Sequence, residues 1–321
     1  MTTIPGVGPA RYSATPFPAQ WVFMFAKLPG VVRLPLVMLL LALNIVVHVI
    51  PLFVLTLFKV IVPVRAIRLA LSHGLVRIAE SWMAVNNAMF DGFTRTRWQV
   101  EGVRGLRDDR NYLVLCNHQS WADIPVLQKI FNRRIPSMRF FLKSQLIWVP
   151  LLGPAWWALD FPFMKRYSKE KLAAHPQLQG KDREATRRAC EKFRRMPVSV
   201  MNFVEGTRFT PAKHAVQKSA YRNLLRPKAG GLAFVLDAMG DALNALLDVT
   251  IVYPGGPYTI MDLIAGRIRE IRVHVRELPI TADLRGDYEA DLAFRAHFQT
   301  WVNALWADKD ARIGGMLRRE G

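Results

Sequence analysis

Residues 112–123 read YLVLCNHQSWAD, and this stretch decides the fold. Its first five residues, Tyr112–Cys116, form an apolar run after polar neighbours, which predicts a short buried strand. A helical pattern follows, so His118 and Asp123 stand between the end of a strand and the start of a helix. Ligands of α/β proteins bind at the carboxyl ends of strands. We therefore expect a functional site in this segment.

The rest of the chain repeats this alternation of short apolar runs with helical patterns. The predicted strands are residues 97–100, 112–116, 139–143, 198–204, 248–253 and 269–275. The predicted helices are residues 121–131, 145–158, 183–195, 231–239 and 287–306. Residues 175–180 and those after 308 are expected to be an exposed loop and a frayed terminus. The pattern is typical of an α/β protein with a mixed, largely parallel sheet flanked by helices.

His118 and Asp123 have two open interpretations. Histidine has a pKa suited to taking a proton from a hydroxyl group, and a carboxylate on its other ring nitrogen fixes the tautomer. The pair must then meet across a turn, because five residues is not a same-face helical spacing. Alternatively, Ser120 and Asp123 form a capping box, and Asp123 serves only the start of the helix. The pair by itself does not separate these interpretations.

The segment Leu34–Phe58 contains no charged residue and exceeds the roughly 20 residues that cross a bilayer core. Residues 1–20 lack the pattern of a removable signal peptide, so we expect the segment to be retained as a membrane anchor. Basic residues stand at both ends, so charge gives no orientation. Pro51 leaves a re-entrant hairpin open beside a single spanning helix. For His48, a packed, hydrogen-bonded or interfacial position is favoured over an intramembrane functional role.

Residues 65–89 show apolar side chains at helical spacing with basic residues between them. This predicts an amphipathic helix, which either lies on lipid headgroups or packs on the globular body.

The chain has 44 Lys and Arg against 25 Asp and Glu, a formal charge of +19. Nucleic acid, an anionic membrane leaflet and phosphorylated substrates all fit such a charge. Because many basic residues flank apolar segments, we favour membrane lipid and phosphate and expect no nucleic acid. The two cysteines, Cys116 and Cys190, have no metal-ligand spacing, so we expect neither a disulfide framework nor a bound metal. Cys116 is expected to be a buried strand residue rather than a nucleophile.

Residues 117–123 resemble the His-x4-Asp block of the glycerolipid acyltransferase superfamily, which includes 1-acylglycerol-3-phosphate acyltransferase. Later blocks agree in order and spacing: residues 140–143, 148–153 and 163–166 with the second, FVEGTR at 203–208 with the third, and VTIVYP at 249–254 with the fourth. Residues 209–213 and 225–230 are similar to the branch of lysocardiolipin acyltransferases and bacterial inner-membrane acyltransferases. Four ordered blocks are far more specific than any one of them.

The resemblance implies a membrane-bound enzyme that moves a fatty acyl group from acyl-CoA or acyl carrier protein to a lysophospholipid hydroxyl. The first expectation for the acceptor is 1-acylglycerol-3-phosphate, with His118 as general base and Asp123 as its partner. The residues implied to bind substrate phosphate are Lys143, Arg166, Glu205, Gly206, Thr207 and Arg208, with Asn117, Ser120 and Lys228 as weaker candidates. No bound cofactor is implied.

The third block also has a physical interpretation of its own. A strand that ends in Glu-Gly-Thr-Arg can turn at Gly206 and present amides, a hydroxyl and the Arg208 guanidinium to a phosphate. The alternative is an ordinary turn with a solvated arginine. The chain departs from the family at Lys165, where an aspartate or asparagine is usual, and at Val204, where a proline is usual. The first change adds positive charge where phosphate is expected.

The predicted organisation is an N-terminal segment (1–30), a membrane-inserted helical segment (31–64), an amphipathic helix with a linker (65–92), an acyltransferase domain (93–308) and a tail (309–321). The expected location is the bacterial inner membrane, with the catalytic domain facing the cytosol. The tract 146–157, rich in tryptophan, is read as an acyl tunnel, a membrane contact or a plain core helix. Backbone amides after Ser120 are expected to help hold an oxyanion. Two alternatives remain: another lipid acceptor, or a non-catalytic basic adaptor at the membrane.

Overall fold

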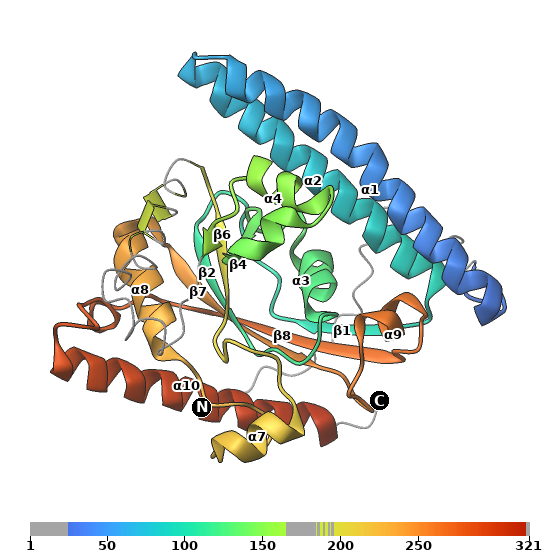
Figure 1. Ribbon diagram of the computed structural model, residues 1–321. Coiled ribbons are helices and arrows are strands. Elements are labelled where there is room, and N and C mark those ends of the chain that lie inside the picture. Colours follow the sequence, from blue (N-terminus) through green and yellow to red (C-terminus); the bar gives the residue numbers. More distant parts are fainter. Residues whose placement is uncertain are drawn as a thin grey trace.

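The computed structural model describes residues 25–164 and 196–318, together with Glu184, Arg187, Arg188, Cys190, Glu191 and Phe193. A central sheet carries helices on both faces, and two long helices lie along one side of the body (Figure 1).

The main sheet has the strand order β1-β8-β7-β2-β6-β3. The bounds of its strands are β1 Arg97–Glu101, β2 Tyr112–Cys116, β3 Met138–Phe140, β6 Ser199–Phe203, β7 Ala245–Val252 and β8 Glu270–Leu278. Every pairing in it is parallel except that of β7 with β8. The predicted mixed, largely parallel sheet is confirmed. A small second sheet pairs β4 Leu142–Lys143 with β5 Phe163–Met164.

Helices cover both faces of the sheet. Their bounds are α1 Gly30–Ile61, α2 Arg65–Phe93, α3 Asp123–Phe131, α4 Leu152–Ala158, α7 Pro211–Gln217, α8 Ala229–Met239, α9 Ile260–Ile264 and α10 Leu292–Arg318. Short 3-10 turns are η2 Ser144–Trp148, η4 Gly240–Ala242 and η5 Ala282–Leu284. The apolar cluster under α2 and α3 lies on one face of the sheet, and the cluster under α8 and α10 lies on the other.

Strand β2 lies inside the sheet between β7 and β6, and all five of its residues are therefore fully buried. Alternate side chains of a strand point to opposite faces. Cys116 accordingly joins the cluster under α3, whereas Leu115 joins the cluster under α8 and α10. Since β2 pairs in parallel with both β6 and β7, its carboxyl end lies between theirs.

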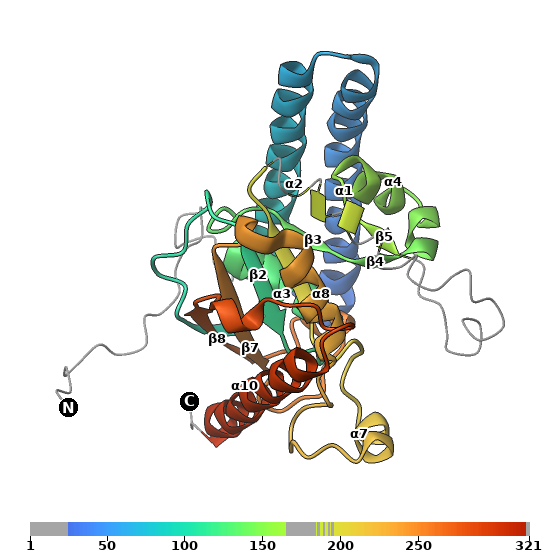
Figure 2. The same ribbon diagram turned by 90° about the vertical axis from the view of Figure 1, so that its left-hand side faces the viewer.

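Helices α1 and α2 run antiparallel as a hairpin that turns at residues 62–64 (Figure 2). Among the described residues, α1 is the one helix long and apolar enough to cross a membrane. Pro51 lies inside α1 without breaking it, so the chain does not reverse within the predicted membrane segment. Helix α2 packs along α1 and against the body, although its first turn is exposed. Of the two interpretations of residues 65–89, packing on the body is therefore favoured over a position on lipid headgroups.

Polar side chains fasten the two helices together. The Asn44 side chain donates to the Asn86 carboxamide oxygen at 2.8 Å and to the Trp82 carbonyl at 3.1 Å. His48 Nε2 lies 3.2 Å from the hydroxyl of Ser81. His48 is therefore a packed, hydrogen-bonded residue of the hairpin, as favoured from the sequence.

Two predicted elements are corrected by the structure. The strand 139–143 is two strands in different sheets, β3 and β4. The helix 145–158 breaks into η2 and α4, because Pro150 cannot continue the turn and Leu151 has a φ of 62°. The core-helix reading of this tract is wrong, since Trp148 is 84% exposed.

The end of the chain is also corrected. Helix α10 starts later than predicted and continues to Arg318, so residues 309–318 are not a frayed tail. Lys309 is fully buried and pairs with Asp248, and Ile313 and Met316 belong to the apolar core. The domain boundary at 308 is therefore wrong. Most of the predicted helix 183–195, and residues 175–180, lie outside the described residues.

Candidate active site

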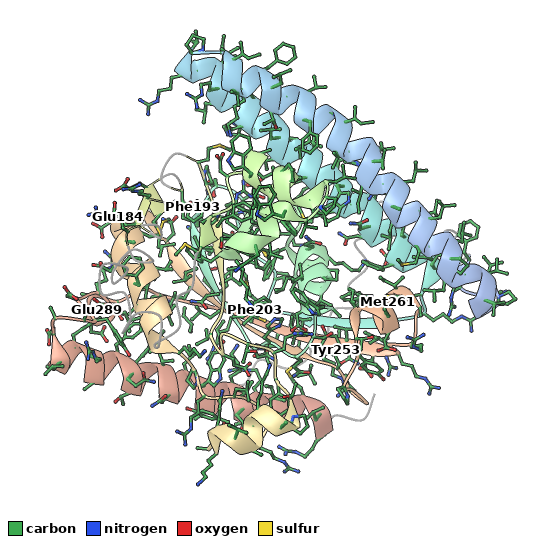
Figure 3. All side chains as sticks on the ribbon, in the orientation of Figure 1. Glu184, Phe193, Phe203, Tyr253, Met261 and Glu289 are labelled. Atoms are coloured by element: carbon green, nitrogen blue, oxygen red, sulfur yellow. The ribbon has the colours of Figure 1, made fainter. Side chains whose placement is uncertain are left out.

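The candidate site lies at the carboxyl end of β2, where loops from β6 and β7 meet it. Phe203 ends β6 and Tyr253 follows β7, and both side chains are labelled in Figure 3. The loop 117–122 leads from β2 into α3 between these two strand ends.

His118 and Asp123 meet across this loop. The Nδ1 atom of His118 lies 2.8 Å from Oδ2 of Asp123, whose side chain is fully buried. A carboxylate only accepts hydrogen bonds, so Nδ1 carries the proton and Nε2 is the basic nitrogen. Among the residues that the structure describes, none hydrogen bonds to Nε2, and the His118 side chain is 12% exposed.

Asp123 also organises the loop, as the capping interpretation expected. Its Oδ2 accepts the N–H groups of Gln119 at 2.7 Å and Ser120 at 3.0 Å. Its Oδ1 accepts the hydroxyl of Tyr253 at 2.6 Å. Ser120 is not the helix cap, because its hydroxyl accepts the N–H of Ala122 in a tight turn and α3 begins only at Asp123. The Asp123 carboxylate thus both orients His118 and holds the turn in shape.

The His118 ring lies flat on an aromatic side chain. It stacks on Phe203 with ring centroids 3.9 Å apart and an angle of 15°. Phe140 stacks against Phe203 at 6.3 Å, and Phe161 stacks against Phe140 at 6.3 Å. This row of rings limits how far the imidazole can tilt and leads from the site towards the second sheet.

Glu205 holds the main chain of the site. Its Oε1 accepts the N–H of His118 at 2.9 Å, and its Oε2 accepts the N–H of Leu225 at 2.9 Å. Burial raises the pKa of Glu205 to about 7, against the effect of these two donors. The prediction that Glu205 binds phosphate is wrong, because the carboxyl group is fully buried and both oxygens are occupied.

Asn117 is likewise a structural residue rather than a substrate contact. Its side-chain amide donates to the Ile251 carbonyl and accepts the Ile251 N–H, both at 2.9 Å. This pairing continues the β2–β7 ladder by one step. Ser120 is also buried and occupied within the turn.

The third block forms a turn beside His118. Gly206 has a φ of +68°, and a Cβ there would meet the Lys228 side chain at 3.0 Å, so glycine lets Lys228 lie across the turn. Lys213 donates to the Thr207 hydroxyl at 2.7 Å and to the Arg208 carbonyl. The turn therefore gathers positive charge.

Arg208 stacks its guanidinium on Trp121, 4.9 Å from the ring centroid. Trp121 belongs to the same loop as His118 and is 51% exposed. No ion pair joins Arg208 to a carboxylate within the described ranges. The stacking places a cation next to the loop that carries His118.

Of the two remaining predicted phosphate ligands, the structure describes only Lys143, which makes no hydrogen bond or ion pair with His118 among the described residues. Lys143 lies on β4 in the second sheet, in register with Met164 of β5. Arg166 and Lys165 lie outside the described residues.

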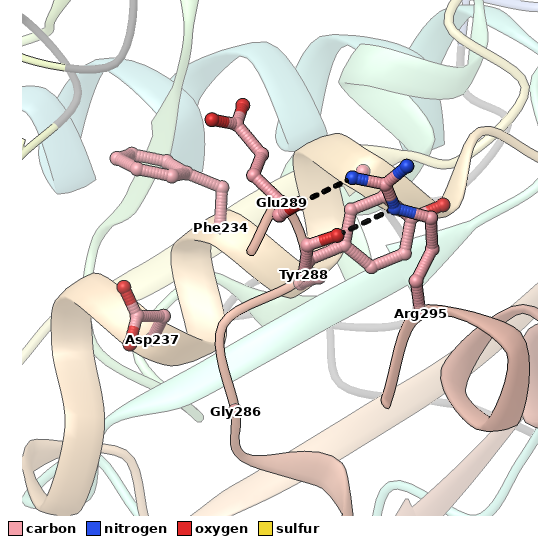
Figure 4. Close-up of a pocket in the computed structure, with 8 residues that line it drawn as sticks. Phe234, Asp237, Gly286, Tyr288, Glu289 and Arg295 are labelled. Carbon is pink, nitrogen blue, oxygen red and sulfur yellow. Dashed lines mark hydrogen bonds between the residues drawn. The ribbon is translucent and has the colours of Figure 1, made fainter. Parts of the chain in front are cut away.

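Cys116 is fully buried, and burial raises the pKa of its thiol well above the usual value, so it is no nucleophile. Over the described part of the chain, no three His, Cys, Asp or Glu side chains gather as metal ligands do. A cavity of about 300 Å³ lies apart from the site, between α8 and the segment before α10 (Figure 4). There Arg295 donates to the carbonyls of Tyr288 and Glu289, and none of the predicted site residues lines the cavity.

Sequence reasoning missed several residues of the site. Tyr253, Phe203, Trp121 and Lys213 all contact predicted residues but were not predicted as site residues themselves. All four lie within stretches quoted for the family resemblance, which is the signal that could have found them.

Comparisons with known proteins agree with this geometry. The Acyltransferase family pattern matches residues 97–254. Lysocardiolipin acyltransferase 1 of Danio rerio is 26% identical over 255 residues, covering 74% of this chain and 60% of that protein. The 1-acyl-sn-glycerol-3-phosphate acyltransferase gamma of Mus musculus is 24% identical over 261 residues, covering 77% and 62%. The matches thus span about three fifths of the length of these relatives.

A solved structure is also similar. The 1-acyl-sn-glycerophosphate acyltransferase of Thermotoga maritima superposes with a TM-score of 0.49 at 18% identity, covering 87% of this chain and 98% of that one. The family pattern includes the His118–Asp123 pair, the turn at Gly206 and the end of β7. Over residues 97–254 the chain therefore matches the Acyltransferase family, and it is similar to lysocardiolipin and 1-acyl-sn-glycerol-3-phosphate acyltransferases.

Proposed function

We propose that this protein transfers a fatty acyl group from a thioester carrier, acyl-CoA or acyl carrier protein, to the free hydroxyl of a lysophospholipid. The first candidate for the acceptor is 1-acylglycerol-3-phosphate. The observation that carries the proposal is the hydrogen bond between His118 and Asp123, which leaves the basic Nε2 atom available beside a positively charged turn. The names of the relatives support the same chemistry.

The reaction proceeds in a ternary complex. Nε2 of His118 takes the proton of the acceptor hydroxyl as its oxygen attacks the thioester carbonyl carbon. Asp123 stabilises the resulting imidazolium through Nδ1–H. When the tetrahedral intermediate collapses, the carbon–sulfur bond breaks, the thiolate leaves, and His118 returns the proton to sulfur. No covalent acyl-enzyme is needed.

Of the backbone amides expected to hold the oxyanion of that intermediate, Trp121 N–H is the one that makes no hydrogen bond among the described residues. The N–H groups of Ser120 and Ala122 are already donated within the loop, to Asp123 and to the Ser120 hydroxyl. They are therefore not available to the substrate in this structure.

The positive turn fits a phosphate-bearing acceptor. Arg208 and Lys228 supply a planar guanidinium and an ammonium group beside the loop of His118. A lysophospholipid phosphate held there brings its glycerol hydroxyl towards Nε2. Another lysophospholipid headgroup remains the alternative acceptor.

The exposed apolar side chains of α1 support membrane association. Leu39, Ile50 and Ile61 are each more than half exposed on this helix, which is more than a water-soluble surface usually shows in one place. We propose that α1 contacts the bacterial inner membrane and that the catalytic domain faces the cytosol, where acyl thioesters are available.

The test uses purified protein in detergent or vesicles with labelled acyl-CoA and a panel of lysophospholipids. His118→Ala is expected to lower kcat by about a thousandfold, because the base is lost. Asp123→Asn is expected to lower it strongly as well, and circular dichroism checks that the fold survives.

The matched control is His297→Ala. His297 also contacts an aspartate, with Nε2 3.0 Å from Oδ2 of Asp283, but this pair is exposed and far along the chain from the site. Activity equal to wild type in His118→Ala would contradict the proposal. It would favour the non-catalytic adaptor, whose lipid binding is sensitive to salt and indifferent to His118.

A further inference from the structure

Tyr253 reaches the site because of the register of β7. Asn117 pairs with Ile251 through both of its amide hydrogen bonds, which fixes β7 against the start of the catalytic loop. Side chains two residues apart on a strand share a face. Val249, Ile251 and Tyr253 accordingly all belong to the cluster under α3, and Tyr253 falls beneath the loop that carries His118.

The hydroxyl of Tyr253 donates to Oδ1 of Asp123 at 2.6 Å. The tyrosine is 4% exposed and the aspartate is fully buried, so no water competes for this contact. The other oxygen of the carboxylate accepts from His118, Gln119 and Ser120. Within the described residues, Tyr253 is thus the sole donor to Oδ1.

Tyr253 is itself held from two directions. Its carbonyl oxygen accepts the N–H of Gly256 at 3.0 Å. Its ring meets the ring of Tyr258 edge to face, with centroids 6.4 Å apart. A rigidly held phenol fixes the plane of the carboxylate that it touches, because Oδ1 cannot move without losing the hydrogen bond from Tyr253.

We propose that Tyr253 is a positioning residue for proton transfer. Its hydrogen bond holds the Asp123 carboxylate in place and weakens the attraction of that carboxylate for the proton on His118. The inference rests on the proposed function of the His118–Asp123 pair and adds a third member to it. A buried tyrosine needs some acceptor, and a backbone carbonyl would satisfy it equally well. Here the acceptor is the group that orients the base.

The direction of the effect follows from charge. The hydroxyl dipole stabilises the Asp123 carboxylate and partly offsets its attraction for the imidazolium. Without it, the carboxylate holds the protonated form of His118 more strongly, so the base is neutral only at higher pH. The other ionisable groups near His118 are Glu205, on its main-chain N–H, and the cations of the neighbouring turn, which are Arg208, Lys213 and Lys228. The substitution touches none of them.

The experiment compares Tyr253→Phe with Tyr112→Phe. Tyr112 is a buried tyrosine on β2 whose hydroxyl accepts the N–H of Arg107, away from the site. Both changes remove one buried hydroxyl and keep the ring. For Tyr253→Phe we expect kcat to fall about tenfold, the scale of one hydrogen bond to a charged group. We also expect the acid limb of kcat/KM to move up by about half a pH unit or more.

The substrate phosphate titrates in the same way with every variant, so a difference between the pH profiles of two variants comes from a group of the protein. Tyr112→Phe is expected to keep the wild-type pH profile. Replacing Tyr253 with 3-fluorotyrosine, a stronger donor that keeps the ring and the hydroxyl, is expected to move the limb to lower pH. This second variant serves as the test if Tyr253→Phe does not fold.

The inference is overturned if Tyr253→Phe loses activity with an unchanged pH profile, or if 3-fluorotyrosine leaves the limb in place. It is also overturned if Tyr253→Phe lowers the activity of Asp123→Asn as much as that of wild type, since residues acting as a unit are not additive. The variant His118→Ala distinguishes a failure of the proposed function from a failure of the role of Tyr253. Full activity in that variant refutes the proposed function, whereas a dead His118→Ala with a normal Tyr253→Phe refutes only the role of Tyr253.

Discussion

Glu205 joins two loops through a carboxyl group that lies out of reach of water. It accepts one N–H from the loop of His118 and one from the segment that precedes α8. Burial raises its pKa to about 7 from an ordinary value of 4.5. The site is therefore assembled around a group that changes charge near neutral pH.

The stability of the protein should depend on this charge. The pKa of Glu205 is higher in the folded protein than in the unfolded chain, so the folded protein holds this proton more tightly. The resulting contribution to the free energy of unfolding is complete below pH 4.5 and is lost as the pH rises to about 7. The change over that window is about 3 kcal/mol for an isolated group. Thermal unfolding in detergent at pH 5, 6, 7 and 8 should show wild type losing stability as the pH rises.

Glu205→Gln cannot ionise, so its unfolding temperature should fall less over the same range, although its absolute stability is lower because one N–H loses its acceptor. Equal pH slopes for the two proteins would show that Glu205 does not titrate in this window.

Trp121 supports Arg208 by stacking rather than by charge pairing. A cation–π contact at an exposed site contributes about 0.5–1 kcal/mol. Trp121→Leu is therefore expected to raise KM for a lysophospholipid about three- to fivefold with little change in kcat. Trp98→Leu, which removes a comparable stack under Lys129 away from the site, should leave KM unchanged. A loss confined to kcat would show that Trp121 does not act on acceptor binding.

The residues of the site differ in how well sequence predicts them. His118 and Asp123 lie five positions apart, so their meeting depends on one local turn. Tyr253 lies 130 positions from Asp123, and its contact depends on the register of β7 against β2. That register is set by pairing over the whole sheet, which no local pattern encodes. Glu205 was assigned to phosphate because its motif shows a charge and not its burial.

At the scale of elements, buried strands were predictable and interruptions were not. β2 is a continuous apolar run, which a central parallel strand requires, and three of the five residues of β6 are apolar. The sequence of residues 139–143 looks like one strand. In the structure its first part belongs to β3 and its last part to β4, and the two lie in different sheets because they pair with different strands. The sequence predicts a frayed end for the last turns of α10, because its charged residues obscure the apolar pattern of the buried helix face.

Lys309 is the charged residue that ties this helix to the sheet. It is fully buried, pairs with Asp248 and donates to the Val249 carbonyl. Breaking a buried pair by removing one partner costs about 3–5 kcal/mol. Lys309→Ala is expected to lower the free energy of unfolding by about that amount in urea denaturation.

Arg187→Ala is the control for this change, because Arg187 forms an exposed ion pair with Glu184 that contributes less than about 1 kcal/mol. If Lys309→Ala unfolds at the same urea concentration as Arg187→Ala, residues 309–318 behave as the frayed tail that their sequence suggests.

At the scale of the whole molecule, the position of α1 bears on how the protein meets a membrane. Contacts with the body run along the helix, from Arg33, which donates to the Ala265 carbonyl, to Lys59, which pairs with Asp160 at 2.7 Å. Leu52 packs with α4 between these ends. The outward face is apolar, and Trp148 is 84% exposed on η2 next to α4. An upright, spanning α1 would draw the body into the bilayer with it.

We therefore expect α1 to lie flat in the membrane interface with the body on one side. Single cysteines are placed at Val64, in the turn of the hairpin, and at Thr300, on the exposed side of α10; the native cysteines are buried. In sealed vesicles, a thiol reagent that cannot cross the membrane should label both positions from the cytosolic side and neither from the other. Labelling of Val64→Cys from the opposite side to Thr300→Cys would show that the hairpin crosses the bilayer. Because α1 and α2 are joined by the Asn44–Asn86 hydrogen bond, that crossing would have to include both helices.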